Sequence, residues 1–259
     1  MRNNIKSLIL PGIVGLVYLF LYLPIIILVV FSFNQPGNVY SWNGFTFYWY
    51  TELFQSKEIW LAFINSLIIA VSAVVFSLTL GVLAVWGLRK SSRPYISIFY
   101  STMLIPDVVI AVGLLVFFGF FVIPLSLNSL IVAHTLLGLG FVVPIVNSRL
   151  LELEEQVVEA SLDLGATEWQ TFIRVVLPFL KPSIIAAALS VFIFSLDDFL
   201  FCFFCASSSF QTLPIYIFAM IRSGASPIIN ALSTLILVIS SLLVLFFSLI
   251  KIRSVSRKI

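Results

Sequence analysis

The chain has 259 residues, of which 61% are apolar and only 10% are charged, and its formal net charge is +3. Soluble domains carry roughly 25% charged residues, so most of this surface has to face lipid or other protein. The basic residues stand singly between apolar runs, which excludes a nucleic-acid-binding surface. One His and two Cys exclude a His-rich metal site and a disulfide framework. No glycine-rich nucleotide-binding motif is present, so the chain is not expected to use ATP by itself.

Charge-poor stretches predict six membrane-spanning helices. They cover residues 8–33, 62–88, 98–122, 125–148, 182–206 and 223–250. Arg2 and Lys6 precede the first stretch, which is long enough to span and has no cleavage pattern after it, so we interpret it as a retained span rather than a signal peptide. We therefore expect an all-α, multi-pass membrane protein in which residues 1–259 form a single transmembrane domain.

The distribution of basic residues predicts the orientation of these helices. If the spans alternate, 12 of the 14 Lys and Arg residues fall on one side, and only Lys57 and Arg222 fall on the other. The positive-inside rule places the first side, with both termini, in the cytoplasm. The aromatic loop 34–61 then lies outside. Its rings are expected either to form a belt at the membrane–water interface or, for one ring such as Trp42, to line the outer mouth of a transport pathway and stack on a cationic substrate.

One long polar segment, residues 149–181, lies between the fourth and fifth predicted spans and holds six of the 11 acids. Gly165 predicts a turn between two helices, and Thr167 begins a capping box that starts the second. Pro178 and Pro182 are expected to end that helix before the fifth span. Apolar residues recur on one face of the segment at helical spacing: Leu162, Ala166, Trp169, Ile173 and Val176. Because the segment is acidic, we expect it to dock on a protein rather than on anionic lipid.

This segment resembles the "EAA" loop of ABC-type importer permeases. The matching residues are Glu159-Ala160-Ser161, Gly165-Ala166, Phe172 and Leu177-Pro178, with Ser161 in place of the second Ala and Val175 in place of the usual Ile. In that family the loop folds as two short helices that insert into a cleft of the ATPase subunit. The resemblance therefore implies that contact with an ATPase is made by Glu159, Ala160, Gly165, Ala166, Leu177 and Pro178.

Over nearly the whole chain, the resemblance extends to the spermidine/putrescine branch of these permeases. Its most telling matches are Asp163-Leu164-Gly165-Ala166, Leu196-Asp197-Asp198 and residues 226–232. It implies an inner-membrane importer of alternating-access type with a second permease subunit, two ATPases that bind ATP and Mg, and an external polyamine-binding protein. No cofactor is expected in this chain. The alternatives are a permease for another solute, such as ferric iron or thiamine, and a proton-coupled secondary transporter.

Three acids lie inside the predicted spans, where no basic residue accompanies them: Asp107, Asp197 and Asp198. A carboxylate in hydrocarbon costs about 2.5–3.5 kcal/mol, and a cationic substrate in a wet cavity would offset this. Neighbouring side chains on a helix point about 100° apart. Unless the helix is broken, we therefore expect one of Asp197 and Asp198 in the substrate pathway and the other at a helix contact. With Trp42, the three acids are the candidate pathway residues.

Each of these acids also has a purely structural interpretation. Asp107 follows Pro106 and suits the first turn of a helix, and the aspartate pair suits hydrogen bonds to Ser or Thr on a neighbouring helix. Further residues in the spans are interpreted as packing: His134, Cys202 and Cys205, with Gly138 and Gly140 allowing helices to approach closely. No metal site is expected.

Overall fold

The computed structural model describes the backbone of residues 2–38, 41–89, 94–207, 210–224 and 227–256. Side chains are described for residues 11–38, 41–89, 95–207, 210–224 and 227–242. The chain divides into two compact units, one formed by residues 1–60 with 217–259 and the other by residues 61–216. Many of the basic residues that predict the orientation, including Arg2, Lys6, Lys90 and Arg93, lie outside the described side chains.

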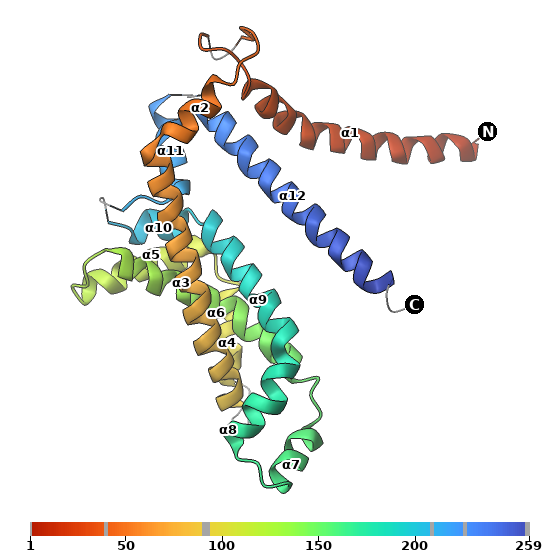
Figure 1. The fold of residues 1–259 in the computed structure, drawn as a ribbon, viewed down its shortest axis with the longest axis vertical. Coiled ribbons are helices and arrows are strands. Elements are labelled where there is room, and N and C mark those ends of the chain that lie inside the picture. The colour runs from red at the N-terminus through yellow and green to blue at the C-terminus, as the bar shows by residue number, and fades with distance from the viewer. Residues whose placement is uncertain (1, 39–40, 90–93, 208–209, 225–226, 257–259) are drawn as a thin grey trace. The chain divides into compact units, whose positions relative to one another are not determined.

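Helices make up the named elements of the described chain, which confirms the all-α class (Figure 1). In chain order they are α1 (Arg2–Phe31), α2 (Tyr48–Gln55), α3 (Lys57–Leu88), α4 (Pro94–Thr102), α5 (Asp107–Phe120), α6 (Leu127–Leu150), α7 (Glu155–Asp163), α8 (Glu168–Thr171), the π-helical turn η1 (Phe172–Val176), α9 (Leu177–Asp197), α10 (Leu200–Cys205), α11 (Leu213–Ser223) and α12 (Ile228–Ser256).

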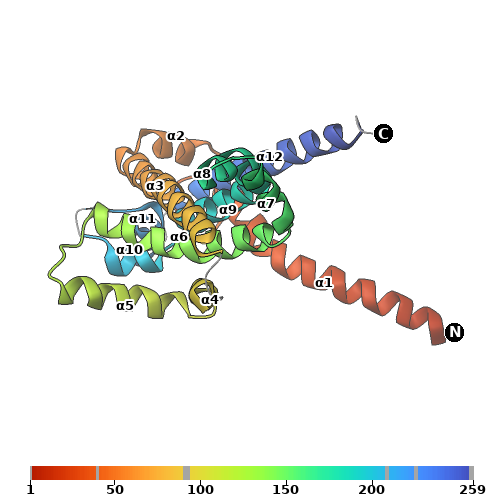
Figure 2. The ribbon, with the colours of Figure 1, turned by 90° about the horizontal axis from the view of Figure 1, so that it is seen from below.

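Four described helical stretches are long and apolar enough to cross a membrane, and they match the first, second, fourth and fifth predicted spans: Pro11–Phe31, Lys57–Leu88, Leu127–Leu150 and Glu168–Asp197. The predicted span 98–122 is wrong as a single helix, because α4 and α5 meet at 111° (Figure 2). Counted as one, this bent pair gives a fifth crossing. The sixth predicted span coincides with α12, whose part with described side chains, Ile228–Leu242, is a shorter apolar helix. Six spans therefore remain a prediction.

The bend between α4 and α5 falls at a proline. Pro106 has a ψ of 134°, which is outside the helical range, and it precedes the first residue of α5. Proline also disfavours the helical conformation of the residue before it, here Ile105. An apolar stretch that is uniform in composition thus changes direction where its backbone cannot stay helical.

The expectation that Pro178 and Pro182 end the second helix of the polar segment is wrong. The π-helical turn η1 joins α8 to α9, so one helical stretch runs from Glu168 to Asp197. Pro178 directly follows the π-helical turn, and a local π adjustment of this kind lets a helix accommodate a proline that lacks an N–H. Pro182 lies inside α9, and neighbouring protein groups in membrane bundles commonly compensate for such a proline.

The predicted fifth span, 182–206, is broken between its neighbouring aspartates. Asp197 is the last residue of α9, Asp198 has an extended backbone with φ −69° and ψ 123°, and α10 begins at Leu200. The geometry of a continuous helix therefore does not apply to Asp197 and Asp198.

In the unit formed by residues 1–60 and 217–259, α12 contacts both α1 and α2. The aromatic loop after α1 is folded around Asn34. Its side-chain amide donates to the Ser41 carbonyl at 2.7 Å and its Oδ1 accepts from the Asn43 N–H at 2.6 Å. The indole of Trp49 donates to the Asn34 carbonyl at 2.8 Å. These bonds organise the loop without a strand.

In the unit formed by residues 61–216, α6 is the central helix and contacts α4, α5, α9 and α10. Small residues let its neighbours approach. A Cβ built on Gly138 would lie 2.7 Å from the Ser77 Cβ of α3, and one built on Gly140 would collide with the Thr102 side chain of α4. This confirms the packing role predicted for Gly138 and Gly140.

Candidate substrate pathway and coupling loop

A cavity of about 250 Å³ lies at the bend between α4 and α5. Its walls come from the bend, from α6 and from α10: Thr102, Met103, Asp107, Ile110, Leu136, Leu137, Gly140, Phe141 and Phe201. Asp107 is the charged residue among them. It is exposed and is the first residue of α5. The helix start and the cavity therefore coincide at this side chain, and the two interpretations made from the sequence do not exclude each other.

Asp198 lies at the break between α9 and α10, where the protein binds its carboxylate. Its Oδ2 accepts from the Cys202 N–H at 3.1 Å and its Oδ1 from the Phe201 N–H at 3.4 Å. The same Oδ2 lies 3.6 Å from Nε2 of His134 on α6, and the side chain is 9% exposed. Asp197, one residue earlier, is exposed. The break thus gives the two neighbouring acids different surroundings.

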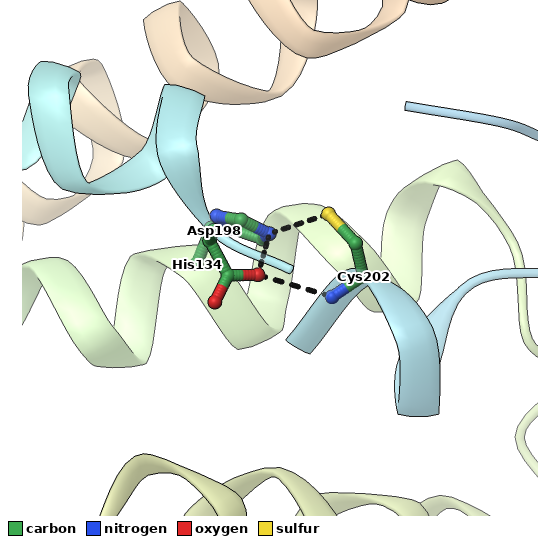
Figure 3. Close-up of side chains that lie close together, drawn as sticks. All are labelled: His134, Asp198 and Cys202. Atoms are coloured by element: carbon green, nitrogen blue, oxygen red, sulfur yellow. Dashed lines mark hydrogen bonds and ion pairs between the residues drawn. The ribbon is translucent and has the colours of Figure 1, made fainter. Parts of the chain in front are cut away.

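His134 lies at the centre of a buried polar cluster (Figure 3). Its Nδ1 is 2.8 Å from the Ser195 Oγ of α9, and its Nε2 is 3.5 Å from the Cys202 Sγ of α10. The prediction that His134 is a hydrogen-bonded packing residue is confirmed. Sequence reasoning missed that Asp198 and Cys202 lie beside it, because 68 residues separate His134 from Cys202 and no local pattern connects them.

Trp42 belongs to the unit formed by residues 1–60 and 217–259, whereas the three acids belong to the other. Its side chain is 49% exposed, and its ring packs edge-on against Phe31 at the end of α1, with centroids 6.3 Å apart. About half of this residue is thus exposed, which is compatible with both interpretations made from the sequence.

The polar loop has the predicted local structure of helix, glycine turn and capped helix. Gly165 follows α7 with φ +87°, a left-handed conformation that favours glycine. Thr167 and Gln170 form the capping box, in which the Thr167 N–H donates to Gln170 Oε1 at 2.9 Å and the Gln170 N–H donates to Thr167 Oγ1 at 3.2 Å. Glu159 and Ala160 are exposed on α7.

Apolar side chains are exposed around this turn. The exposed fraction is 89% for Leu164, 58% for Trp169 and 43% for Ile173. Val176 is buried, so the apolar face predicted from the sequence divides into an exposed part near the turn and a part that joins the core. Of the other residues assigned to the loop contact, Ala166 and Leu177 are half-buried and Pro178 is exposed.

One contact of this loop was not predicted. Arg89, at the end of α3, forms an ion pair with Glu168, the first residue of α8, and its guanidinium lies 3.3 Å from the ring centroid of Trp86. Arg89 and Glu168 are 79 residues apart, so no spacing in the sequence indicates the pair. It ties the capped helix to a neighbouring membrane helix.

Several membrane helices, a mostly apolar cavity with one carboxylate and an exposed glycine-turn loop are features expected of a permease component of a transport system. Residues 73–259 match the family "Binding-protein-dependent transport system inner membrane component", and the chain belongs to this family. Members are multi-pass proteins of the inner membrane that act in transport.

Particular relatives refine this assignment. The chain is 36% identical over 250 residues to the spermidine/putrescine transport system permease protein PotC of Escherichia coli (strain K12), covering 95% of each chain. It is 33% identical over 231 residues to the putrescine transport system permease protein PotI of the same organism, covering 85% of this chain and 82% of PotI. A crystal structure of a bacterial ABC transporter involved in the import of the acidic polysaccharide alginate has the same fold. Its TM-score is 0.71 at 15% identity, and 97% of each chain is covered.

Proposed function

We propose that this chain is one permease subunit of an ATP-driven importer that moves spermidine or putrescine across a bacterial inner membrane by alternating access. The likeness to PotC and PotI along most of the chain supports the polyamine substrate. The structural observation that carries the proposal is the cavity at the α4–α5 bend, whose charged lining residue is an acid. Polyamines are cations, and an apolar cavity with a carboxylate is suited to an ammonium group rather than to an anion.

Within this pathway the three acids have different roles. Asp107 contacts the cation in the cavity. Asp197, exposed at the end of a membrane helix, faces water or the partner permease, because a carboxylate facing lipid is costly. Asp198 acts at the contact between helices, since its oxygens are already bonded within the chain. Trp42 lies at the outer mouth and stacks on the incoming cation.

The loop around Gly165 is proposed to dock on the ATPase. The exposed side chains of Leu164, Trp169 and Ile173 supply an apolar contact area, and Glu159 and Ala160 are exposed on the adjoining helix. The partners are a second, PotB-like permease, a PotA-like ATPase dimer that binds ATP and Mg, and a PotD-like binding protein. We propose that both termini and the loop lie in the cytoplasm, as the basic residues predict.

Uptake of labelled spermidine and putrescine into vesicles tests the proposal. The vesicles carry this chain with its permease, ATPase and binding-protein partners. We expect uptake that requires ATP and that unlabelled polyamine competes away. Uptake driven by a proton gradient without ATP would contradict the importer class. ATP-dependent uptake of ferric iron or thiamine, with none of polyamine, would contradict the substrate.

Gly165→Val tests the coupling loop. A β-branched residue is strained at φ +87°, so we expect uptake to be abolished while the chain still inserts in the membrane. Gly87→Val is the matched control, because Gly87 lies in α3 and a Cβ there meets nothing within 4 Å. Co-purification of the ATPase with each variant reports docking directly. Normal uptake and normal co-purification of Gly165→Val would show that the turn is not required.

A further inference from the structure

We infer that His134, Asp198 and Cys202 form a binding site for one divalent metal ion of the Zn²⁺ type. Each residue offers one ligand atom, and the three atoms lie within 4.8 Å of one another (Figure 3). His134 and Cys202 are 0% and 1% exposed. This inference concerns a site apart from the proposed transport of polyamines, and it gives Cys202 a chemical role where the sequence indicates only packing.

The spacing of the ligand atoms is close to that of a tetrahedral site. Zinc binds His nitrogen at about 2.0–2.1 Å, carboxylate oxygen at about 2.0–2.2 Å and thiolate sulfur at about 2.3 Å. At tetrahedral angles these bond lengths place the nitrogen about 3.5 Å from the sulfur and about 3.4 Å from the oxygen. His134 Nε2 is 3.5 Å from Cys202 Sγ and 3.6 Å from Asp198 Oδ2. Both distances from Nε2 are thus close to those of a tetrahedral site.

Groups around the three residues already orient them. With the proton of His134 on Nδ1 and donated to Ser195 Oγ at 2.8 Å, the lone pair of Nε2 is directed at Asp198 and Cys202. The Asp198 carboxylate is fixed by the two backbone N–H groups at the start of α10. Hydrogen bonds of this kind fix ring tautomer and ligand direction in metal sites, and their removal typically weakens metal binding about 10- to 100-fold.

Charge balance also favours an ion at this position. A neutral imidazole, one carboxylate and one thiolate carry two negative charges, and a divalent cation brings the site to zero. Metal coordination deprotonates a thiol, so the thiolate forms as the ion binds. A buried cluster without net charge costs less in a membrane interior than one that carries a net charge. Nitrogen, oxygen and sulfur together suit zinc, and three protein ligands leave a fourth position for water.

The position of the site gives a bound ion a consequence for movement. Its ligands come from α6, from the break between α9 and α10, and from α10, so coordination would fix α10 against α6. Phe201, the neighbour of Cys202, lines the cavity at the α4–α5 bend and packs 6.1 Å from the His134 ring. An ion bound at the site would therefore hold one wall of that cavity in place.

Metal titration of the purified full-length chain, with any polyhistidine tag removed, tests the inference. Co²⁺ is the probe, because a cobalt–thiolate bond gives a charge-transfer absorption band that other ligands do not give. We expect one Co²⁺ per chain, with the thiolate band, displaced by Zn²⁺. In Cys202→Ser the band should be lost and affinity should fall by more than about 100-fold, beyond the usual effect of a surrounding group.

Cys205→Ser is the matched control. Cys205 is also buried on α10, but its Sγ lies 3.8 Å from the Ala111 carbonyl instead. Its loss should leave Co²⁺ binding unchanged. Ser195→Ala, which keeps all three ligands, should retain the band and weaken binding about 10- to 100-fold. Absence of the band in the folded wild-type chain, or its persistence in Cys202→Ser, would overturn the site. Since the chain is titrated without partners or polyamine, failure of the proposed transport function would not affect the result.

Discussion

Two helices in the unit formed by residues 61–216 begin beside an aspartate, and the protein treats the two carboxylates differently. Asp107 begins α5 at a proline bend, is exposed in a cavity, and makes no hydrogen bond or ion pair with a described residue. Asp198 precedes α10 at a break in a membrane helix, accepts two backbone hydrogen bonds and lies 3.6 Å from His134. Both interrupt an apolar stretch, but only Asp198 is satisfied within the chain.

We propose that this difference separates a structural acid from a functional one. A carboxylate in a membrane is expensive, so its charge needs hydrogen bonds, a counter-ion or water. At Asp198 the protein supplies the bonds, and the acid shapes a helix break. At Asp107 the start of α5 supplies part of the compensation, and we propose that a cation in the cavity supplies the rest. The contrast assigns the cation contact of the proposed pathway to Asp107.

Among the variants that test this contrast, the largest effect is expected for Asp107→Asn, which changes the acid that has no partner among the described residues. Asn keeps the shape but removes the charge, and the loss of a charged hydrogen bond of about 1.5–3 kcal/mol corresponds to roughly 10- to 100-fold weaker uptake. Concentration-dependent uptake of labelled polyamine measures it. Glu58→Gln, which removes an acid from the first turn of α3, is the control. Unchanged uptake in Asp107→Asn would reduce Asp107 to a helix-start residue and end the contrast.

Gly140→Ala tests how the bend beside Asp107 is packed. A Cβ at this position collides with Thr102 at the end of α4, so we expect a destabilisation of about 1–3 kcal/mol, seen as a lower thermal unfolding midpoint in detergent. Gly113→Ala in α5 is the control, because a Cβ there meets nothing within 4 Å. Equal midpoints for the two variants would mean that the bend is not supported by this close approach.

Asp198→Asn tests the other acid, whose carboxylate accepts hydrogen bonds from the backbone. The amide oxygen can still accept one backbone hydrogen bond, but the second bond at the start of α10 and the charge that strengthens both are lost, so we expect a destabilisation of about 1–2 kcal/mol. Thermal unfolding measures this loss, and polyamine uptake should fall less than in Asp107→Asn. If uptake fell further in Asp198→Asn while the unfolding midpoint stayed at the wild-type value, the roles of the two acids would be reversed.

The smallest effect is expected for Pro106→Ala. Pro106 fixes the entry into α5 without supplying a contact to the cavity, and its replacement mainly frees the unfolded chain, at a cost of about 0.4–1 kcal/mol. A small fall in the unfolding midpoint with near-normal uptake is the expected result. A fall in uptake as large as that of Asp107→Asn would mean that the proline, rather than the charge, defines the site.

The sequence predicted what depends on neighbouring residues. Absence of charge located the long apolar helices, and the capping box at Thr167 and the turn at Gly165 follow from local backbone chemistry. The proline rule failed at Pro178, because a π-helical turn carries the helix through, and this depends on packing against other helices.

The candidate site was only partly predictable. Asp107, Asp197 and Asp198 could be singled out, because charge in an apolar stretch is conspicuous. Their surroundings could not be derived, because they depend on a 111° bend and a helix break inside stretches of uniform composition. Contacts such as His134 with Cys202 join residues 68 positions apart and leave no periodic pattern in the chain.

The π-helical turn has a mechanical consequence. Because η1 joins α8 to α9, the helix that begins at Glu168 continues for 30 residues to Asp197, a rod of about 45 Å. Because the helix is continuous, a displacement of its Glu168 end is expected to move its Asp197 end as well. The first joint it reaches is the break at Asp198. A movement of the ATPase that is proposed to dock at the loop would thus be transmitted through this helix to the break at Asp198.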